Sequence, residues 1–194
     1  SINFDVGIAN LPEFVDIKTF DTTYTVIEPY VKIRIYYDNE LHELIYQVIE
    51  PELDEKSRKI LKLIENSMEE LINISFIAIK DQKTVIEFLE KNVLLLLSEL
   101  KIDVSREVFI KILYYIYRDF VGMNRMEPIL RDYFIEDIEC NGVQTPVYIV
   151  HRKYKNLRTN LVYKTLPELT RFVEKVAQKC GKYISYATPL LDGT

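Results

Sequence analysis

The hydrophobic period of this chain changes twice, and the order of these periods constrains the fold more than any other sequence feature. Apolar and polar residues alternate around Val31, Ile33 and Ile35, which predicts a half-buried strand. Between about residues 60 and 116 the apolar residues recur every three or four positions, as in an amphipathic helix. After residue 125 the alternation returns. The chain is therefore expected to be α+β, with strands on both sides of a helical block.

A six-residue segment occurs twice in the first 51 residues. Tyr24-Thr25-Val26-Ile27-Glu28-Pro29 is matched by Tyr46-Gln47-Val48-Ile49-Glu50-Pro51. Proline has no N–H for a β-ladder, so each copy predicts a strand that ends at its proline. Asp38-Asn39-Glu40 predicts the turn of a hairpin whose strands begin at Val31 and Leu41. The sequence does not determine which sheet this hairpin joins.

Three helices are predicted next, over about 60–72, 81–100 and 105–116. Asp81 and Ser105 are good N-cap residues, and Gly122 supplies a helix stop. Short connections between three amphipathic helices indicate a small bundle. The run of four leucines at 94–97 fits either an exposed partner face or, more commonly, a helix buried on two sides.

The last third of the chain is expected to be strand-rich. Strands are predicted at 135–140, 147–151 and 157–163, with Asn141-Gly142 as a turn signal and Lys155-Asn156 in the following turn. Thr165-Leu166-Pro167-Glu168 is a capping box that begins a helix ending at Gly181, and a last strand is predicted at 183–187. The expected subdomains are an N-terminal arm and β-hairpin over 1–51, a helical bundle over 52–122 and an α/β part over 123–194.

Composition and charge exclude several classes of protein. Hydrophobic residues make up 48% of the 194 residues and charged residues 28%, as in soluble globular chains. The longest aliphatic run, Val93 to Leu97, is far too short to span a membrane. Residues 1–151 carry 27 acidic and 16 basic side chains, whereas residues 152–182 carry two acidic and nine basic ones. This asymmetry indicates two surfaces with different partners, or only a solvated face with a skewed count.

Motifs for the common enzyme chemistries are absent from the sequence. It has no phosphate-binding loop, no dinucleotide-binding glycine pattern, no zinc-protease motif and no nucleophile elbow. His151 lies on the apolar face of its strand, so we expect a packed residue rather than a catalyst. Cys140 and Cys180 occupy apolar positions and are expected to be small buried residues. We therefore predict no catalytic residue, no metal site and no cofactor for this chain.

The stretch from His151 to Arg158 concentrates positive charge. Four cations and one aromatic are predicted at a hairpin tip, at Arg152, Lys153, Tyr154, Lys155 and Arg158. Such a tip suits phosphates, single-stranded nucleic acid or an arginine that reaches a nucleotide across a subunit interface. A solvated turn is the alternative. The net charge of −5 weakens the nucleic-acid interpretation.

Several segments resemble, in order, the archaeal branch of the type II/type IV secretion ATPase superfamily. They are Gly122-Met123-Asn124-Arg125-Met126-Glu127-Pro128-Ile129-Leu130-Arg131-Asp132, Ile135 to Gly142, Val147 to Arg152, Tyr183 to Tyr186 and Pro189 to Gly193. The twin Val-Ile-Glu-Pro segments are also similar to the N-terminal region of this branch. The resemblance is greatest to the motor ATPases of the archaellum, followed by archaeal pilus-assembly ATPases.

This resemblance implies the N-terminal regulatory and oligomerisation domain of a hexameric ATPase that powers archaellum or type IV pilus-like filament assembly. It implies that the α/β part is a PAS-like antiparallel sheet with flanking helices. It also implies that the ATP- and magnesium-binding motifs lie beyond Thr194, so that this chain alone is no ATPase. By position, Arg152 and Arg158 are the candidates for nucleotide or subunit contact.

The resemblance also implies partners and a location. The expected partners are further copies of the chain, a polytopic membrane platform protein and a cytosolic accessory ring protein, and not nucleic acid. The candidate partner-binding residues are the carboxylates Glu52, Asp54, Glu55, Glu69 and Glu70. The location is expected to be cytoplasmic, peripheral to the membrane through partners. The alternative from another class is a stand-alone PAS-like interaction or sensor module.

Overall fold

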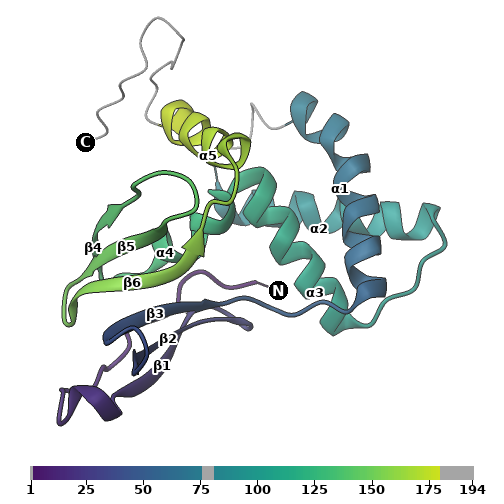
Figure 1. Cartoon of the computed structure of the whole chain (residues 1–194). Helices are drawn as coiled ribbons and strands as arrows, with labels where there is room; N and C mark the ends of the chain where they lie inside the picture. Colours follow the sequence, from purple (N-terminus) through teal and green to yellow (C-terminus); the bar gives the residue numbers. More distant parts are fainter. Residues whose placement is uncertain (1, 76–80, 180–194) are drawn as a thin grey trace, which may run out of the picture.

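Six strands form one curled sheet that packs on its inner face against helices. The computed structural model describes residues 2–75 and 81–179. The strand order is β1-β2-β3-β6-β5-β4, so the strands at the start and end of the chain share one sheet (Figure 1). The chain is therefore α+β, as its periodicity predicts, and the early hairpin joins the late strands.

The first half of the sheet is an antiparallel meander of β1 (Asp21–Ile27), β2 (Val31–Asp38) and β3 (Glu43–Ile49). The alternation predicted for β2 is confirmed, because Val31, Ile33 and Ile35 are buried. As predicted, each copy of the repeat ends a strand: β1 ends at Ile27 and β3 at Ile49, directly before the Glu-Pro pair of each copy. The two copies thus place equivalent residues on β1 and β3.

The second half is a further meander of β4 (Ile135–Glu139), β5 (Pro146–His151) and β6 (Lys155–Val162). The halves meet where β3 and β6 run parallel, in the register Ile45 to Arg158 and Tyr46 to Thr159. The sheet is consequently mixed rather than wholly antiparallel. The turn between β5 and β6 lies at residues 152–154, earlier than predicted, because Lys155 already belongs to β6.

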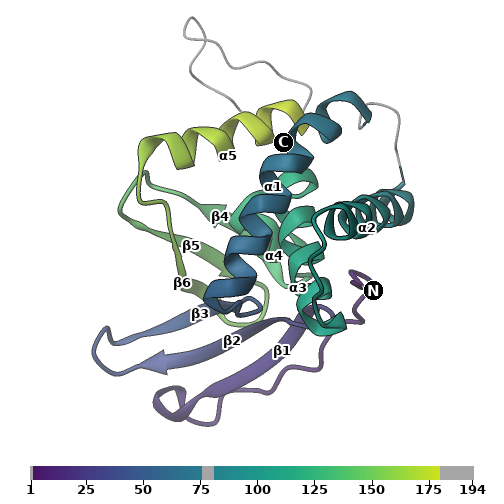
Figure 2. The same cartoon turned by 90° about the vertical axis from the view of Figure 1, so that its right-hand side faces the viewer.

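Three helices follow β3: α1 (Glu55–Ser75), α2 (Gln82–Glu99) and α3 (Arg106–Ile116). The predicted caps are confirmed, since Asp81 accepts a hydrogen bond from the Thr84 amide and Ser105 accepts one from the Val108 amide. Helix α3 continues into a π-helical turn, Tyr117–Val121. Figure 2 shows α1 in front of the sheet and α2 on the side of the bundle away from β4–β6.

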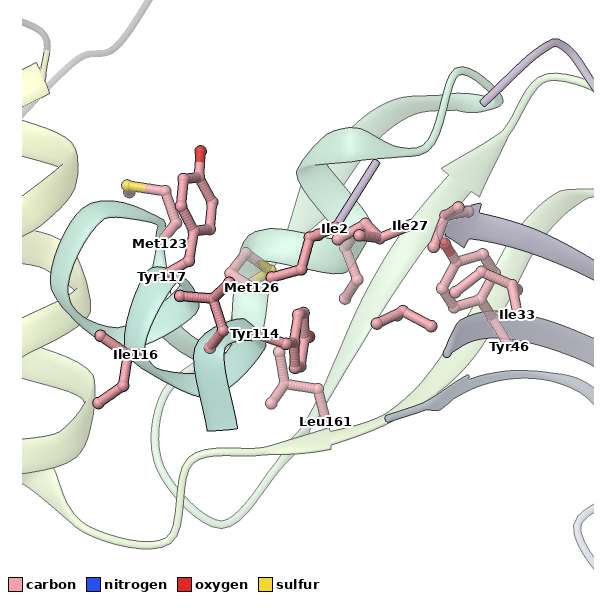
Figure 3. Packing of buried hydrophobic residues seen from close by; sticks show 14 of the residues in the cluster. Ile2, Ile27, Ile33, Tyr46, Tyr114, Ile116, Tyr117, Met123, Met126 and Leu161 are labelled. Carbon is pink, nitrogen blue, oxygen red and sulfur yellow. The ribbon is translucent and has the colours of Figure 1, made fainter. Parts of the chain in front are cut away.

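Two further helices connect the bundle to the sheet. The short α4 (Glu127–Arg131) precedes β4, and α5 (Leu166–Lys179) follows β6. Figure 3 shows buried side chains from both units in one core, with Tyr114 of α3 and Leu161 of β6 close together and Ile33 and Tyr46 further into the sheet. The helices and the sheet therefore share a single hydrophobic core.

Some sequence predictions fall outside this description or are wrong. The predicted helix stop at Gly181, the strand at 183–187, the segment 189–193 and Cys180 lie outside the described residues. Cys140 is exposed rather than buried, because it follows the last residue of the edge strand β4.

Candidate functional site

A polar network lies inside the core where the edge strand β1 approaches the segment before β4. The hydroxyls of Tyr24 and Tyr46 both donate to Oδ2 of Asp132, over 2.6 and 2.7 Å. The Phe134 amide donates to Oδ1 of the same carboxyl group. The two tyrosines are the first residues of the two repeat copies, so the repeat brings two equivalent donors to one acceptor. Asp132 is 6% exposed, and burial raises its pKa above the ordinary range.

His151 completes this network from β5. Its ring is fully buried and stacked between Phe134 and Tyr154, with ring centroids 5.2 and 4.9 Å away. Nδ1 accepts hydrogen bonds from the amides of Lys153 and Tyr154, so the proton of the neutral ring belongs on Nε2, 3.4 Å from the Tyr24 hydroxyl. Burial, and then the charge of Lys153, lower the pKa of His151 to about 4. The prediction of a packed histidine is confirmed.

The N-terminal arm covers this network. A cavity of about 40 Å³ lies between residues 4–9 of the arm and the side chains of Tyr24, Asp132 and Phe134. That volume suits a water molecule rather than an organic ligand. The arm is held by Lys153, whose ammonium donates to the Leu11 carbonyl and pairs with Glu13. The network is therefore an internal structural feature in this conformation.

The segment Gly122–Asp132, which carries much of the family resemblance, is a hub that joins several elements. Asn124 accepts a hydrogen bond from Lys175 of α5, whose ammonium also donates to the carbonyls of Asp119 and Gly122. Arg125 donates to the Val162 carbonyl at the end of β6 and to Glu168 of α5. Both contacts fix α5 against the end of the bundle.

The second half of the hub holds α4 and the arm. Glu127 is 2% exposed, and it accepts from the Met123 amide and from Arg131 at 2.7 Å. Arg131 also donates to the Tyr117 hydroxyl and lies over the ring of Phe4 in the arm. The polar residues of this segment thus contact α5, the end of β6 and the arm, and the segment acts as a structural joint.

Two charged clefts run along α1 and meet at Arg118. One cleft of about 950 Å³ lies between α3 and the segment 50–54, and another of about 960 Å³ lies between α1 and α5. Arg118, Asp119 and Glu65 line both clefts. The Arg118 side chain is only 12% exposed and pairs with Glu50 and Asp119 at 2.8 and 2.7 Å. The guanidinium N–H groups of Arg118 therefore donate to carboxylates of the same chain.

The two arginine candidates lie apart from these clefts and differ from each other. Arg158 is not at the hairpin tip, because it lies within β6 opposite Tyr148. Its guanidinium pairs with Glu43 at 3.0 Å on the outer face of the sheet. Arg152 is at the tip, is exposed, and lies 4.7 Å over the ring of Tyr133. In the described part of the chain, Arg152 has no carboxylate within ion-pair distance.

The five acidic candidates divide between the two ends of α1. Glu52 and Asp54 line the first cleft, and Asp54 also caps α1 by accepting from the Ser57 amide. Glu55 pairs with Lys59 at 2.8 Å. Glu69 lines the second cleft, and Glu70 lies in the same part of the helix. Fifteen residues of helix separate the groups by about 20 Å, so the structure does not bring them into one patch.

Sequence reasoning missed the buried Tyr24–Tyr46–Asp132 network and the Glu50–Arg118 pair. The sequence held a signal for the two tyrosines alone, since the repeat places Tyr24 and Tyr46 at equivalent positions. Within residues 2–75 and 81–179, no group of three or more His, Cys, Asp or Glu side chains is arranged to hold a metal ion. Nor does any helix in those ranges have the length and apolar character to cross a bilayer.

No family model matches the chain. It is similar to three proteins of Methanocaldococcus jannaschii. "Uncharacterized protein MJ1288" is 29% identical over 181 residues, which cover 93% of this chain and 71% of that protein. "Uncharacterized protein MJ0781" is 22% identical over 90% of this chain but only 23% of its own length. "Uncharacterized protein MJ0900" is 34% identical over 94 residues, 48% of this chain and 17% of its own length.

Proposed function

We propose that this chain is the N-terminal regulatory and oligomerisation domain of a hexameric secretion-type ATPase that powers archaellum or type IV pilus-like filament assembly. The observation that carries the proposal is the ordered motif match from Gly122 to Gly142, because its polar residues form the hub between helices, sheet and arm. The relatives are archaeal, and the match covers 71% of one of them but less than a quarter of the other two. Such partial matches are expected of a domain that recurs inside longer chains.

In this proposal the domain moves as one body. Nucleotide would lie between it and a following ATPase domain, and ATP with magnesium would supply the hydrolysis that swings the two domains against each other. This chain alone would not hydrolyse ATP. Its own contribution would be rigidity, since Lys175, Arg125 and Arg131 tie α5, β6 and the arm to the hub.

The proposed partners follow from exposed carboxylates that line the first cleft. The carboxylates Glu52 and Asp54 lie at an open cleft and would face basic cytoplasmic loops of a polytopic membrane platform protein or a cytosolic accessory ring protein. The protein would therefore be cytoplasmic and peripheral to the membrane through these partners. No nucleic-acid role is proposed, because the net charge is −5.

Arg152 is the proposed contact to the nucleotide or to a neighbouring subunit. Its guanidinium is exposed at the tip, and a planar fork can bond two phosphate oxygens at once. In the full-length ring, Arg152→Ala should reduce ATP turnover at least tenfold while the fold and assembly persist. Arg158→Ala should instead remove a half-exposed ion pair with Glu43 and change stability by less than about 1 kcal/mol.

The experiment is steady-state ATP turnover of the full-length protein and of both variants, with ring assembly followed by light scattering. Equal turnover in Arg152→Ala and the parent would contradict the proposed contact of Arg152 with the nucleotide or a neighbouring subunit.

The alternative function, a stand-alone PAS-like interaction or sensor module, makes a separate prediction. It requires that the natural protein contain no phosphate-binding loop after Thr194 and show no turnover at full length.

A further inference from the structure

Helix α2 carries an apolar surface that faces away from the core. Its inner face buries Val85, Leu89, Val93 and Leu97. Leu94 and Leu95 are each 51% exposed. The leucine run is thus not buried on two sides, because α2 lies at the outside of the bundle (Figure 2).

A groove extends this surface toward α3. It has a volume of about 690 Å³ and lies between the second half of α2 and the start of α3, with apolar walls from Leu94, Leu97, Ile102, Val104 and Phe109. A neighbouring hollow of about 470 Å³ is lined by Leu94, Leu95, Glu87, Glu90 and Lys91. Because Leu94 and Glu90 line both, the two hollows form one continuous surface along the helix.

Charges of opposite sign flank the exposed leucines. Glu87 and Leu94 are seven residues apart, close to two helical turns, so they lie along one side of α2. Lys101 lies in the turn after the helix and lines the same groove as Leu94. Glu90 lies on the same side as Glu87, one turn closer to Leu94. One end of the surface carries Glu87, Glu90 and Lys91, a net charge of −1, and the other end, past the leucines, carries Lys101, Asp103 and Arg106, a net charge of +1.

We propose that this surface binds the same surface of a second copy of the chain, with the two α2 helices antiparallel. A two-fold axis between Leu94 and Leu95 would place the leucines of both copies in contact. It would also place Lys101 of each copy beside the Glu87 and Glu90 carboxylates of the other, at both ends of the contact. A two-fold interface requires a patch that complements itself, and this order of charges meets that condition.

This contact is separate from the ring and nucleotide roles proposed above. It uses the outside of α2, whereas Arg152 lies in the turn between β5 and β6. The leucines and the groove would supply most of the affinity by excluding water. The reciprocal charges would set the antiparallel direction, and their contribution would weaken as salt rises.

The first experiment measures the mass of the 194-residue chain by sedimentation equilibrium over a wide concentration range. The chain should form dimers, and Leu94→Asp should raise the dissociation constant at least tenfold because a carboxylate would be buried without a partner. The matched control is Leu166→Asp, which changes a leucine 67% exposed at the start of α5 and should leave the dimer unchanged. Circular dichroism would verify that each variant is folded.

A charge-reversal series tests the antiparallel arrangement. Glu87→Lys and Lys101→Glu should each weaken the dimer, and the chain that carries both changes should recover it, because the reciprocal pairs are rebuilt with opposite sign. A chain that stays monomeric up to millimolar concentration would overturn the proposal, as would a dimer insensitive to Leu94→Asp. A double reversal no better than the single changes would overturn the antiparallel register. None of these measurements depends on nucleotide, so their failure would leave the ATPase proposal untouched.

Discussion

At the scale of single residues, the two histidines of this chain lie in opposite environments. His42 is exposed in the turn before β3, whereas His151 is enclosed by two aromatic rings and bonded at Nδ1 by two backbone amides. A protonated Nδ1 would lose both of those hydrogen bonds. The fold therefore holds His151 neutral at pH values where a solvated histidine would bind a proton.

The folded protein should lose stability as the pH falls from 7 to 5 because of His151. The unfolded chain takes up this proton near pH 6.5, but the folded chain does so only near its lowered pKa of about 4. Stability linked to this group is thus present above pH 6.5 and lost progressively between 6.5 and 4. Linkage gives a loss of about 2 kcal/mol between pH 7 and 5.

Urea unfolding at several pH values checks this effect. His151→Phe should flatten the dependence relative to the parent, and His42→Gln should retain it. Asp132 works in the opposite direction, because its raised pKa favours the folded state at low pH, so the variants are compared at each pH rather than against a fixed slope. An identical pH dependence in His151→Phe and the parent would contradict the linkage.

At the scale of elements, the hub shows how much a local sequence signal can predict. The period changes, the two N-caps and the strand-ending prolines depend on neighbouring residues, so strands and helices could be located from the sequence. Lys175, Val162 and Tyr46, which bond to Asn124, Arg125 and Asp132, lie 37 or more residues away from them and could not be located that way. The same limit explains the error at Lys155 and Asn156, where the sequence suggested a turn but pairing with β5 extends the strand.

Gly122 is required at the hub by space rather than by backbone conformation. Its φ is −74°, which any residue adopts, but a Cβ there would lie 2.8 Å from Oε2 of Glu127 and 2.9 Å from the Arg118 carbonyl. Glu127 cannot retreat easily, because it is buried and holds both the Met123 amide and Arg131. Gly122→Ala should therefore destabilise the fold by about 1–3 kcal/mol.

Gly7→Ala is the matched control for this substitution. A Cβ at Gly7 meets nothing within 4 Å, so its effect should remain within about 0.5 kcal/mol. The two variants would be compared by urea denaturation at pH 7. Equal stability of the two would mean that the hub relaxes around the added methyl group without cost.

At the scale of the whole molecule, the sheet is two antiparallel meanders joined by a short parallel contact. The backbone register between β3 and β6 covers only two residue pairs. The amide side chain of Asn160 extends the contact, because its Oδ1 accepts from the Val48 amide at 2.9 Å and its Nδ2 donates to the Val48 carbonyl at 3.0 Å. The Asn160 side chain thus makes two hydrogen bonds of the kind that a neighbouring strand backbone would make. The contact between β3 and β6, which joins the first and last thirds of the chain, depends partly on these bonds.

Asn160→Ala should weaken this join specifically. Both hydrogen bonds to Val48 would be lost, and at the usual net value of a hydrogen bond the cost should be about 1–2 kcal/mol. Because β3 and β6 belong to one core with the helices, unfolding should remain a single transition at a lower urea midpoint. Hydrogen exchange at the Val48 amide should accelerate more than exchange within α3, since the lost acceptor was its own partner.

Asn156→Ala is the matched control. Asn156 is an exposed asparagine of the same strand with no side-chain hydrogen bond to any described residue, so its substitution should change neither the urea midpoint nor the exchange at Val48. If the two alanine variants exchange alike at Val48, the backbone pairs of β3 and β6 hold the two meanders together without help from Asn160.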